Sequence, residues 1–275
     1  MYKIIDTHTH TYPDAIAGKA AENLGKFYNF KVSESGTFRD LEECERKAGI
    51  SGFLLLPVAT SARNVDKINE AAAAQANAAR KDGFEAYAFG CMHQDYPDFQ
   101  NGLESCLRLG LTGIKLHPDL QGENADSDRM FSLYEIMEKL GMSLWLHVGD
   151  ARTQINYSSP DRVARIASAF PKLTVIAAHL GGYREWEKAE QVLMGKYDNV
   201  IYDCSSTLWD MTPERGKYLI EKCGVEKVMF GSDYPAITPG ISLAEFLRLD
   251  FSDAVRQDIL YNNFVGLIVR GGKST

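Results

Sequence analysis

The 275-residue sequence lacks the cysteine pattern of a disulfide-stabilised scaffold. Its five cysteines are an odd number, lie far apart and include no Cys-x-x-Cys pair. In a chain of this length, such residues are typical of reduced, packed thiols in a cytoplasmic protein. The short N-terminal segment already carries Asp6, which argues against a signal peptide. The sequence therefore predicts a cytoplasmic location.

Long basic runs and long hydrophobic runs are missing as well. No run of five lysines or arginines occurs and the formal net charge is -7, which argues against the basic surface of a nucleic-acid-binding protein. The most hydrophobic stretch, residues 53–57, has the length of a strand, whereas a membrane span needs roughly 20 apolar residues. We therefore expect no nucleic-acid or membrane partner, and expect a small-molecule substrate.

The composition that is present, 45% hydrophobic and 24% charged, is that of a globular protein. No proline-rich or serine-rich linker divides the chain, so we expect a single domain over residues 1–275. Short apolar segments alternate with helical ones, which predicts parallel strands joined by helical crossovers. The strands are expected near residues 4–10, 52–57, 85–92, 112–116, 143–148, 173–178, 200–204 and 227–230.

Helical patterns separate these strands. They are expected at residues 38–48, 64–81, 99–109, 126–140, 160–170, 183–196, 213–223, 243–249 and 252–267, with a helix or lid at 15–30. Eight strands alternating with helices predict an α/β protein with a (β/α)8 TIM-type barrel. The alternative, an open doubly wound sheet, lacks the Gly-x-Gly-x-x-Gly turn of dinucleotide binding.

The first predicted strand ends in a pair of histidines, His8 and His10. Because side chains alternate across a strand, both imidazoles point the same way and can reach one metal ion. Neutral imidazole suits zinc, iron, nickel or copper. Two solvated histidines at a polar strand end are the alternative.

Three later strand ends carry matching side chains, His147, His179 and Asp233. In a barrel, the carboxyl ends of the strands converge on one mouth, so these residues can meet His8 and His10 in space. Three histidines and a carboxylate form a plausible divalent metal site with an open position for water. The alternative for His147 and His179 is a core histidine bonded to the backbone.

Four motifs together resemble the amidohydrolase superfamily, and more narrowly its amidohydrolase-related branch, which includes aminocarboxymuconate semialdehyde decarboxylase. The motifs are Asp6-Thr7-His8-Thr9-His10, Leu146-His147, Ala178-His179-Leu180-Gly181-Gly182 and Phe230-Gly231-Ser232-Asp233-Tyr234-Pro235. The resemblance extends from residue 4 to about residue 267, including the closing segment 259–263.

The resemblance implies a distorted (β/α)8 barrel with a divalent metal ion at the strand ends. It implies that the metal ligands are His8, His10, His147 and Asp233. His179 would be catalytic, and Asp233 would also accept the proton of an attacking water in hydrolytic members. Zinc is the ion expected, with manganese and iron also suited to histidine and carboxylate ligands. A homodimer is expected from the habit of the family.

Five further residues are candidates for contact with the substrate. Lys115 and His117 share a strand parity and could both face the barrel interior; in binuclear members a lysine at the position of Lys115 is carboxylated and bridges two metals. Arg152 and Arg184 follow strand ends and could hold a substrate carboxylate in a bidentate pair, with surface arginine as the alternative. Trp209 could cover a planar substrate or simply pack.

The same ligand set serves several reactions. The first hypothesis is hydrolysis of a small carboxylate-bearing ester, lactone or amide through a metal-activated water. The alternative is a metal-dependent non-oxidative decarboxylase (carboxy-lyase), or a hydratase, acting on an unsaturated or aromatic carboxylate. A third hypothesis is a barrel that binds a ligand without turnover. The substrate depends on loops whose conformation the sequence does not give.

Overall fold

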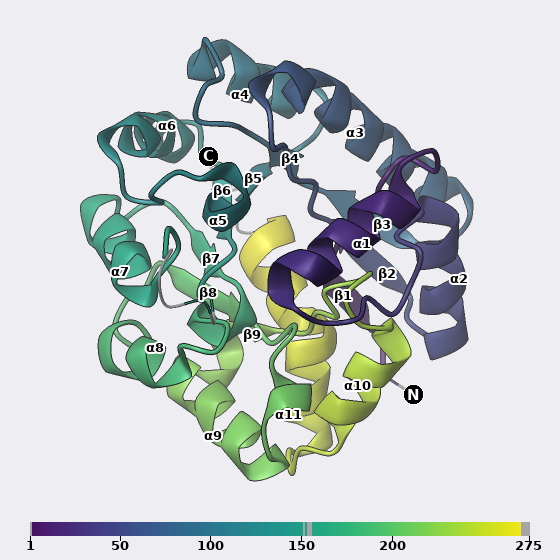
Figure 1. Cartoon of the computed structure of the whole chain (residues 1–275). Helices are drawn as coiled ribbons and strands as arrows, with labels where there is room; N and C mark the ends of the chain where they lie inside the picture. Colours follow the sequence, from purple (N-terminus) through teal and green to yellow (C-terminus); the bar gives the residue numbers. More distant parts are fainter. Residues whose placement is uncertain (1, 151, 153–155, 271–275) are drawn as a thin grey trace.

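The strands of the computed structural model form a parallel barrel surrounded by helices (Figure 1). The structure describes residues 2–150, 152 and 156–270. In this part of the chain the strands are β1 (Ile5–Thr9), β2 (Gly52–Leu55), β3 (Glu85–Ala88), β4 (Gly90–Cys91), β5 (Gly113–Leu116), β6 (Ser143–Leu146), β7 (Val175–Ala177), β8 (Val200–Asp203) and β9 (Val228–Met229).

Two hydrogen-bonded sheets, β1-β2-β3 and β4 through β9, join into one ring. At one junction the backbone amide of Thr7 donates to Phe230 O at 2.9 Å, and Thr9 bridges Tyr234 in parallel register. At the other junction the predicted third strand breaks at Phe89, whose amide still donates to Leu55 O at 3.0 Å. The Phe89 ring fills the space that a side chain at Gly113 would occupy.

The helices lie outside the strands in chain order (Figure 1). They are α1 (Ala17–Tyr28), α2 (Phe38–Ala48), α3 (Val65–Lys81), α4 (Phe99–Arg108), α5 (Pro118–Gln121), α6 (Asp128–Lys139), α7 (Pro160–Ala169), α8 (Trp186–Val192), α9 (Pro213–Cys223), α10 (Pro239–Leu247) and α11 (Asp253–Gln257). The helix predicted at 183–196 is shorter, because Arg184 has a φ of 57°, which an α-helix does not allow. The helix predicted at 252–267 continues beyond α11 as π-helical turns, Asp258–Asn262 and Val265–Arg270.

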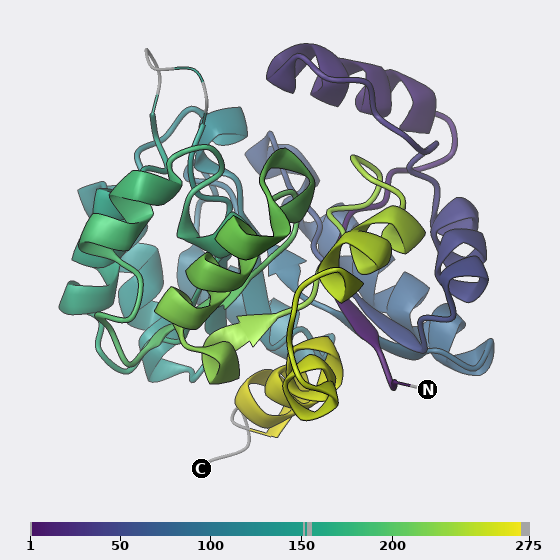
Figure 2. The same ribbon diagram turned by 90° about the horizontal axis from the view of Figure 1, so that it is seen from below.

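Apolar side chains fill both the inside of the ring and the layer between strands and helices. The inner cluster includes Trp145, Ile176 and Met229, and it is closed by Phe264 and Ile268 from the C-terminal turns. Figure 2 shows this C-terminal segment at one end of the barrel and α1 at the opposite end. The N-terminal end of the barrel is therefore closed, and the mouth lies at the carboxyl ends of the strands.

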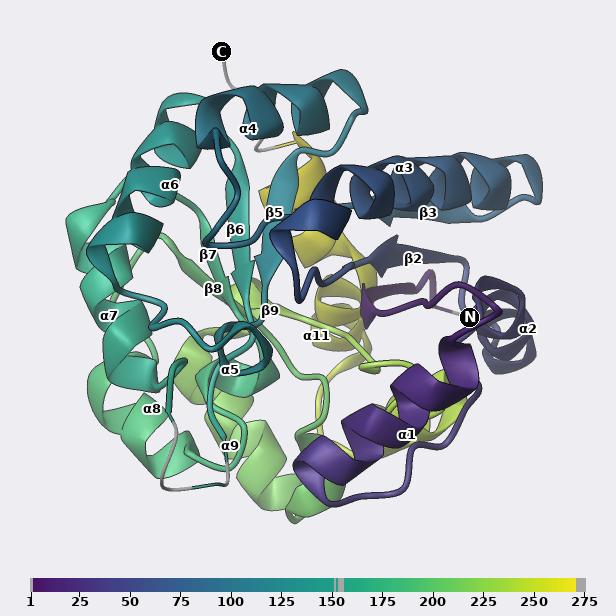
Figure 3. The same ribbon diagram turned by 45° about the horizontal axis from the view of Figure 1, so that its top comes forward.

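Helix α1 crosses this mouth, as Figure 3 also shows. It corresponds to the segment at 15–30 that was predicted to be a helix or a lid. The observed ring of parallel strands with outer helices confirms the predicted (β/α)8 barrel. Within the described residues, no helix combines the length and the hydrophobicity required to span a membrane.

Helix α2 carries a carboxyl group into the interior beside β1. Thr37 caps the helix by accepting the amide of Asp40 at 3.2 Å, and the helix ends at Gly49, which has a φ of 71°. Glu45 is fully buried near the buried Asp6, and neither of its carboxyl oxygens has a hydrogen-bond partner among the described residues. Burial, together with the negative charge of Asp6, raises the pKa of Glu45 well above its usual value. Of the two carboxyl groups, Glu45 is therefore the one that is protonated.

This buried proton predicts that stability falls as the pH rises. The pKa of Glu45 is higher in the folded state, so folding is favoured below the unfolded pKa, and the advantage is lost as the pH rises through the folded pKa. We expect Glu45→Gln, which keeps the size of the side chain but cannot titrate, to reduce this loss of stability by up to about 1.4 kcal/mol for each pH unit. Urea unfolding between pH 5.5 and 8.5 measures the slope. Glu43→Gln, on the exposed face of α2, is the control; equal slopes in all three proteins would contradict the prediction.

Candidate active site

Three of the predicted ligands meet at the mouth of the barrel. His8 and His10 extend from the end of β1, and Asp233 lies in the loop after β9, where its amide donates to His8 O at 2.8 Å. The two Nε2 atoms are 3.1 Å apart. Asp233 Oδ1 lies 3.5 Å from His8 Nε2 and 3.3 Å from His10 Nε2. Residues more than 220 positions apart therefore present three ligand atoms to one point.

The hydrogen bonds of the two imidazoles fix which nitrogens are free. His8 Nδ1 lies 3.0 Å from Asp203 Oδ2, and His10 Nδ1 lies 2.5 Å from the carbonyl oxygen of Leu56. Both partners are acceptors, so each Nδ1 carries the proton and each Nε2 presents a lone pair. Two lone pairs and a carboxylate oxygen facing one another repel unless a cation lies between them.

These residues fit a divalent metal ion. Ligand atoms about 2.1 Å from one ion lie about 3.0–3.4 Å from each other in octahedral or tetrahedral geometry, close to the distances among His8, His10 and Asp233. The donor set of imidazole and carboxylate suits zinc, manganese and iron. The chemistry and spacing of the site therefore agree with a metal centre.

His147 and His179 form a second pair beside this cluster. His179 Nδ1 lies 3.0 Å from the carbonyl oxygen of Ser205, so its Nε2 is free, and this atom faces His147 Nδ1 at 3.0 Å. The rings of His179 and His8 are stacked with centroids 5.1 Å apart. His147 thus contacts His179 rather than His8 or His10, and its role as a metal ligand stays a prediction.

Burial keeps these imidazoles neutral. It lowers the pKa of His8 to about 3, with the nearby charge of Lys115 acting in the same direction. Burial also lowers the pKa values of His147 and His179. Neutral imidazole is the form that binds metals.

Asp203, at the end of β8, is hydrogen-bonded to His8 of the cluster. It was not among the predicted site residues. Its carboxylate accepts from His8 Nδ1 at 3.0 Å, from Trp145 Nε1 at 3.1 Å and from the amide of Ser205 at 2.9 Å. Burial alone would raise the pKa of Asp203, but the interactions with His8 and Ser205 outweigh it and lower the pKa. Asp203 is therefore an ionised acceptor that fixes the tautomer of His8.

Lys115 is fully buried beside the same imidazole. Its Nζ lies 3.2 Å from His8 Nε2, on the side of the ring that faces the ligand cluster. Burial lowers the pKa of Lys115 to about 8. Lys115 is not among the described residues that line the cavity above the cluster, so the structure gives no support for its predicted contact with substrate.

The backbone is unusual at the residues of this site. His179, Leu180, Ser206 and Asp233 have φ angles of 60°, 50°, 47° and 67°. Non-glycine residues rarely occupy this left-handed region, and such strain gathers where side chains must be held for function. At two of these positions the side chains meet, because Ser206 Oγ donates to Asp233 Oδ2 at 2.6 Å.

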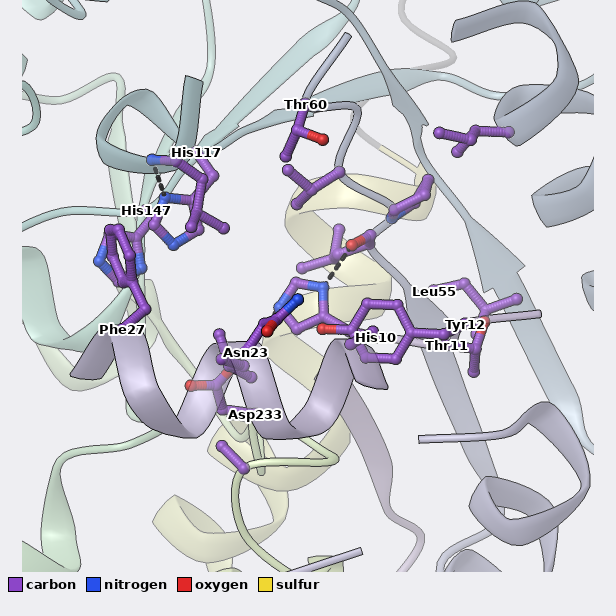
Figure 4. A pocket seen from close by; sticks show the side chains of 18 of the residues that line it. His10, Thr11, Tyr12, Asn23, Phe27, Leu55, Thr60, His117, His147 and Asp233 are labelled. Atoms are coloured by element: carbon purple, nitrogen blue, oxygen red, sulfur yellow. Dashed lines mark hydrogen bonds and ion pairs between the residues drawn. The ribbon is translucent and has the colours of Figure 1, made fainter. Parts of the chain in front are cut away.

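A cavity of about 620 Å³ extends from the cluster beneath α1. Figure 4 shows α1 crossing it with Asn23 and Phe27, with His117 and His147 at one end and Leu55 at the other. Tyr28, also on α1, places its hydroxyl 2.8 Å from His117 Nε2 and 3.0 Å from His147 Nε2. The helix over the mouth thus contributes a polar group to the site.

The remaining predicted contacts divide into two groups. His117 and Trp209 line the cavity. Arg152 and Arg184 do not: Arg152 Nε lies 2.9 Å from both carboxylate oxygens of Asp150, and Arg184 Nε lies 2.7 Å from Asp210 Oδ2. Each guanidinium already has a carboxylate within the protein, as expected for the surface alternative.

The sequence offered a weak signal for two of the residues it failed to single out. Asp203 is a charged residue within an apolar strand, which calls for a buried partner. Ser206 follows the same strand end, where site residues of barrels gather. Tyr28 had no comparable signal, because its contact with two histidines depends on how α1 folds over the mouth.

Comparison with known proteins agrees with this geometry. The sequence matches the amidohydrolase family over residues 5–263. It is 26% identical over 209 residues to 2-amino-3-carboxymuconate-6-semialdehyde decarboxylase from Dictyostelium discoideum, a match that covers 58% of this chain and 55% of that protein. The chain therefore spans about half the length of the curated relative that it matches.

Solved structures share the fold at low sequence identity. An uncharacterized TIM-barrel protein from Bordetella bronchiseptica is 18% identical, with a TM-score of 0.77 over 98% of this chain and 100% of that chain. A dihydroxybenzoic acid decarboxylase from Polaromonas, with bound manganese and the inhibitor 2-nitroresorcinol, is 13% identical, with a TM-score of 0.72 over 100% of both chains. The family match confirms the resemblance of the four motifs, and the chain belongs to the amidohydrolase family of barrel enzymes.

Proposed function

We propose that this chain is a metal-dependent carboxy-lyase that removes carbon dioxide, without oxidation, from an unsaturated or aromatic carboxylate. The observation that carries the proposal is the convergence of His8, His10 and Asp233 at the end of a largely apolar cavity. The names of the Dictyostelium relative and the Polaromonas neighbour support decarboxylation over the hydrolysis that the sequence favoured first.

His8, His10 and Asp233 would hold the metal, with the imidazoles of His147 and His179 beside it. A divalent ion there supplies Lewis acidity toward a carboxylate or carbonyl oxygen of the substrate. We keep zinc as the proposed ion, and the manganese of the Polaromonas structure supports manganese as the competitor. Metal analysis of the isolated protein would distinguish them.

Decarboxylation breaks the bond between the carboxylate carbon and its neighbour. The electron pair stays on the neighbouring carbon, which takes a proton, and carbon dioxide leaves. Asp233, within the ligand cluster, and His179, beside it, can exchange protons with a substrate, and both are unprotonated at neutral pH because their pKa values are lowered. One of them must first take a proton, from solvent or from a substrate hydroxyl, and then deliver it to carbon.

Hydrolysis of an ester or lactone is the second candidate, and one observation favours it. Burial alone would raise the pKa of Asp233, but the interactions with His8 and His10 outweigh it and lower the pKa. Asp233 is therefore a carboxylate, ready to accept a proton from an attacking water, and the hydrogen bond from Ser206 orients it. His179 could then stabilise charge that develops on the carbonyl oxygen.

Isotope labelling separates the two reactions. We expect the metal-loaded enzyme, given a panel of aromatic and unsaturated acids in deuterated water, to release carbon dioxide and leave one deuterium on the vacated carbon. A hydrolase would instead place oxygen-18 from labelled water into the acid product of a lactone or ester. Incorporation of oxygen-18 without carbon dioxide release from any acid would overturn the carboxy-lyase proposal. Mass spectrometry reads both labels.

A homodimer and a cytoplasmic location are kept as proposals that follow from the family resemblance and the cysteine usage. Sedimentation velocity at micromolar concentration would test the first. Fractionation of expressing cells would test the second.

A further inference from the structure

One side of the cavity above the metal cluster is lined by one face of α1 and by Ile16, the residue that precedes this helix. The side chains on this face recur at the spacing of a single helical stripe; they are Ile16, Ala20, Leu24 and Phe27. Such a stripe normally packs against a protein core, yet here it faces open volume. Ile16 is 53% exposed, and Trp209, which also lines the cavity, is 40% exposed. Apolar surface of this kind marks a place where a ligand completes the packing.

Helix α3 and the loop after β2 line the cavity with apolar side chains as well. Helix α3 contributes the stripe Ile68, Ala71 and Ala72, where the alanines leave space that larger residues would fill. The loop after β2 adds Pro57 and Val58. The same cavity is lined by His10 and Asp233 of the ligand cluster, so the apolar residues of α1 and α3 form a slot that includes the cluster.

Charges in the slot are few. Among the described residues that line it, Asp233 belongs to the metal cluster and Lys67 is exposed on α3. The guanidinium groups of Arg152 and Arg184 lie near the Phe27 and Trp209 rings of the lining, but each is already paired with a carboxylate, Asp150 or Asp210. A second substrate carboxylate inside the slot would lose its hydration without gaining a buried cationic partner, which is costly.

We propose that the substrate is an amphiphile with a single carboxylate or ester head at the metal cluster and an extended apolar body along the slot between α1 and α3. Small dicarboxylates are excluded as the preferred substrates. The inference rests on the proposed function, because the head group must lie at His8, His10 and Asp233. It adds the class of substrate, which the ligand set alone does not select.

Binding of simple acids to the zinc-loaded enzyme tests this class without requiring turnover. Isothermal titration calorimetry with straight-chain monocarboxylates, from butanoate to decanoate, should show Kd falling about 3- to 4-fold for each added methylene until the slot is full. Octanedioate should bind at least about 100-fold more weakly than octanoate, because its second carboxylate is desolvated. Affinity that does not depend on chain length, or octanedioate that binds as tightly as octanoate, would overturn the inference.

Variants on α3 locate the apolar body. Ala71→Trp should fill the slot, weaken octanoate binding by about tenfold or more and move the optimum to shorter acids. Ala74→Trp is the matched control, because Ala74 is an exposed alanine of the same helix outside the lining. Lys67→Gln should leave octanedioate binding unchanged. Weaker octanedioate binding in Lys67→Gln would mean that Lys67 anchors a second carboxylate, and the inference would be wrong.

The two proposals fail in different ways. A steep chain-length series with no carbon dioxide release or ester hydrolysis supports the amphiphile inference and contradicts the reaction. A flat series with turnover of small dicarboxylates contradicts the inference and supports the reaction.

Discussion

Asp233→Asn is expected to lower kcat/KM by about 10³-fold, within the 10²–10⁴-fold range of general acid–base groups, and to reduce the metal content of the isolated enzyme. Asparagine keeps the shape of the side chain but can neither hold a proton at this position nor offset the charge of a cation. Asp233 Oδ1 lies within 3.5 Å of both His8 Nε2 and His10 Nε2, so the loss of its charge acts on both functions.

Kinetics at saturating metal, with elemental analysis of the same preparation, separate the two effects. If metal loading is restored and kcat stays low, Asp233 acts on the proton as well as on the metal. Asp210→Asn is the control, because Asp210 is an exposed aspartate that pairs with Arg184 outside the cavity lining. A fully loaded Asp233→Asn enzyme with kcat/KM within tenfold of the wild type would show that Asp233 is not the reacting group.

The fold and the metal cluster could be predicted because both depend on repeated local patterns. Apolar strands that alternate with capped helices specify a parallel barrel, and the barrel brings strand ends together whatever their distance in sequence. His8 lies in β1, His10 follows it and Asp233 lies in the loop after β9, so their meeting needs only the correct ring closure. That closure is observed at Thr7 and Phe230.

The walls of the cavity could not be predicted in the same way. Tyr28 reaches His117 and His147 only because α1 crosses the mouth, and the direction of a loop-borne helix is set by contacts far away in sequence. Arg152 and Arg184 were expected to contact substrate, but Arg152 pairs with Asp150, two positions earlier, and Arg184 pairs with Asp210, which the fold brings from the segment after β8. The contacts of Tyr28 and Arg184 depend on tertiary packing, whereas the pair of Arg152 with Asp150 is local.

Asp203→Asn is expected to weaken metal binding by about 10- to 100-fold, the usual effect of removing a group that orients a metal ligand, although Asp203 is not among the described residues that line the cavity. The carboxylate accepts from His8 Nδ1, Trp145 Nε1 and the amide of Ser205. An asparagine amide would turn one acceptor into a donor. If that donor meets His8 Nδ1, the imidazole must carry its proton on Nε2 and lose the lone pair that the cluster needs.

Competition between Zn²⁺ and a chromophoric chelator would give the metal Kd of the folded variant, and nitrogen chemical shifts of His8 would report its tautomer. Urea unfolding of the same samples should show a loss of about 3 kcal/mol, as for a broken buried charge network. Asp198→Asn, at an exposed aspartate five positions earlier, is the matched control.

Kinetics at saturating metal test whether Asp203 acts through His8 or on the substrate. If Asp203 acts through His8, kcat should recover to within about tenfold of the wild type. A direct role in proton transfer would instead keep kcat reduced by the 10²-fold or more expected of a reacting group. Lower stability with unchanged metal affinity and an unchanged His8 tautomer would reduce Asp203 to a purely structural residue.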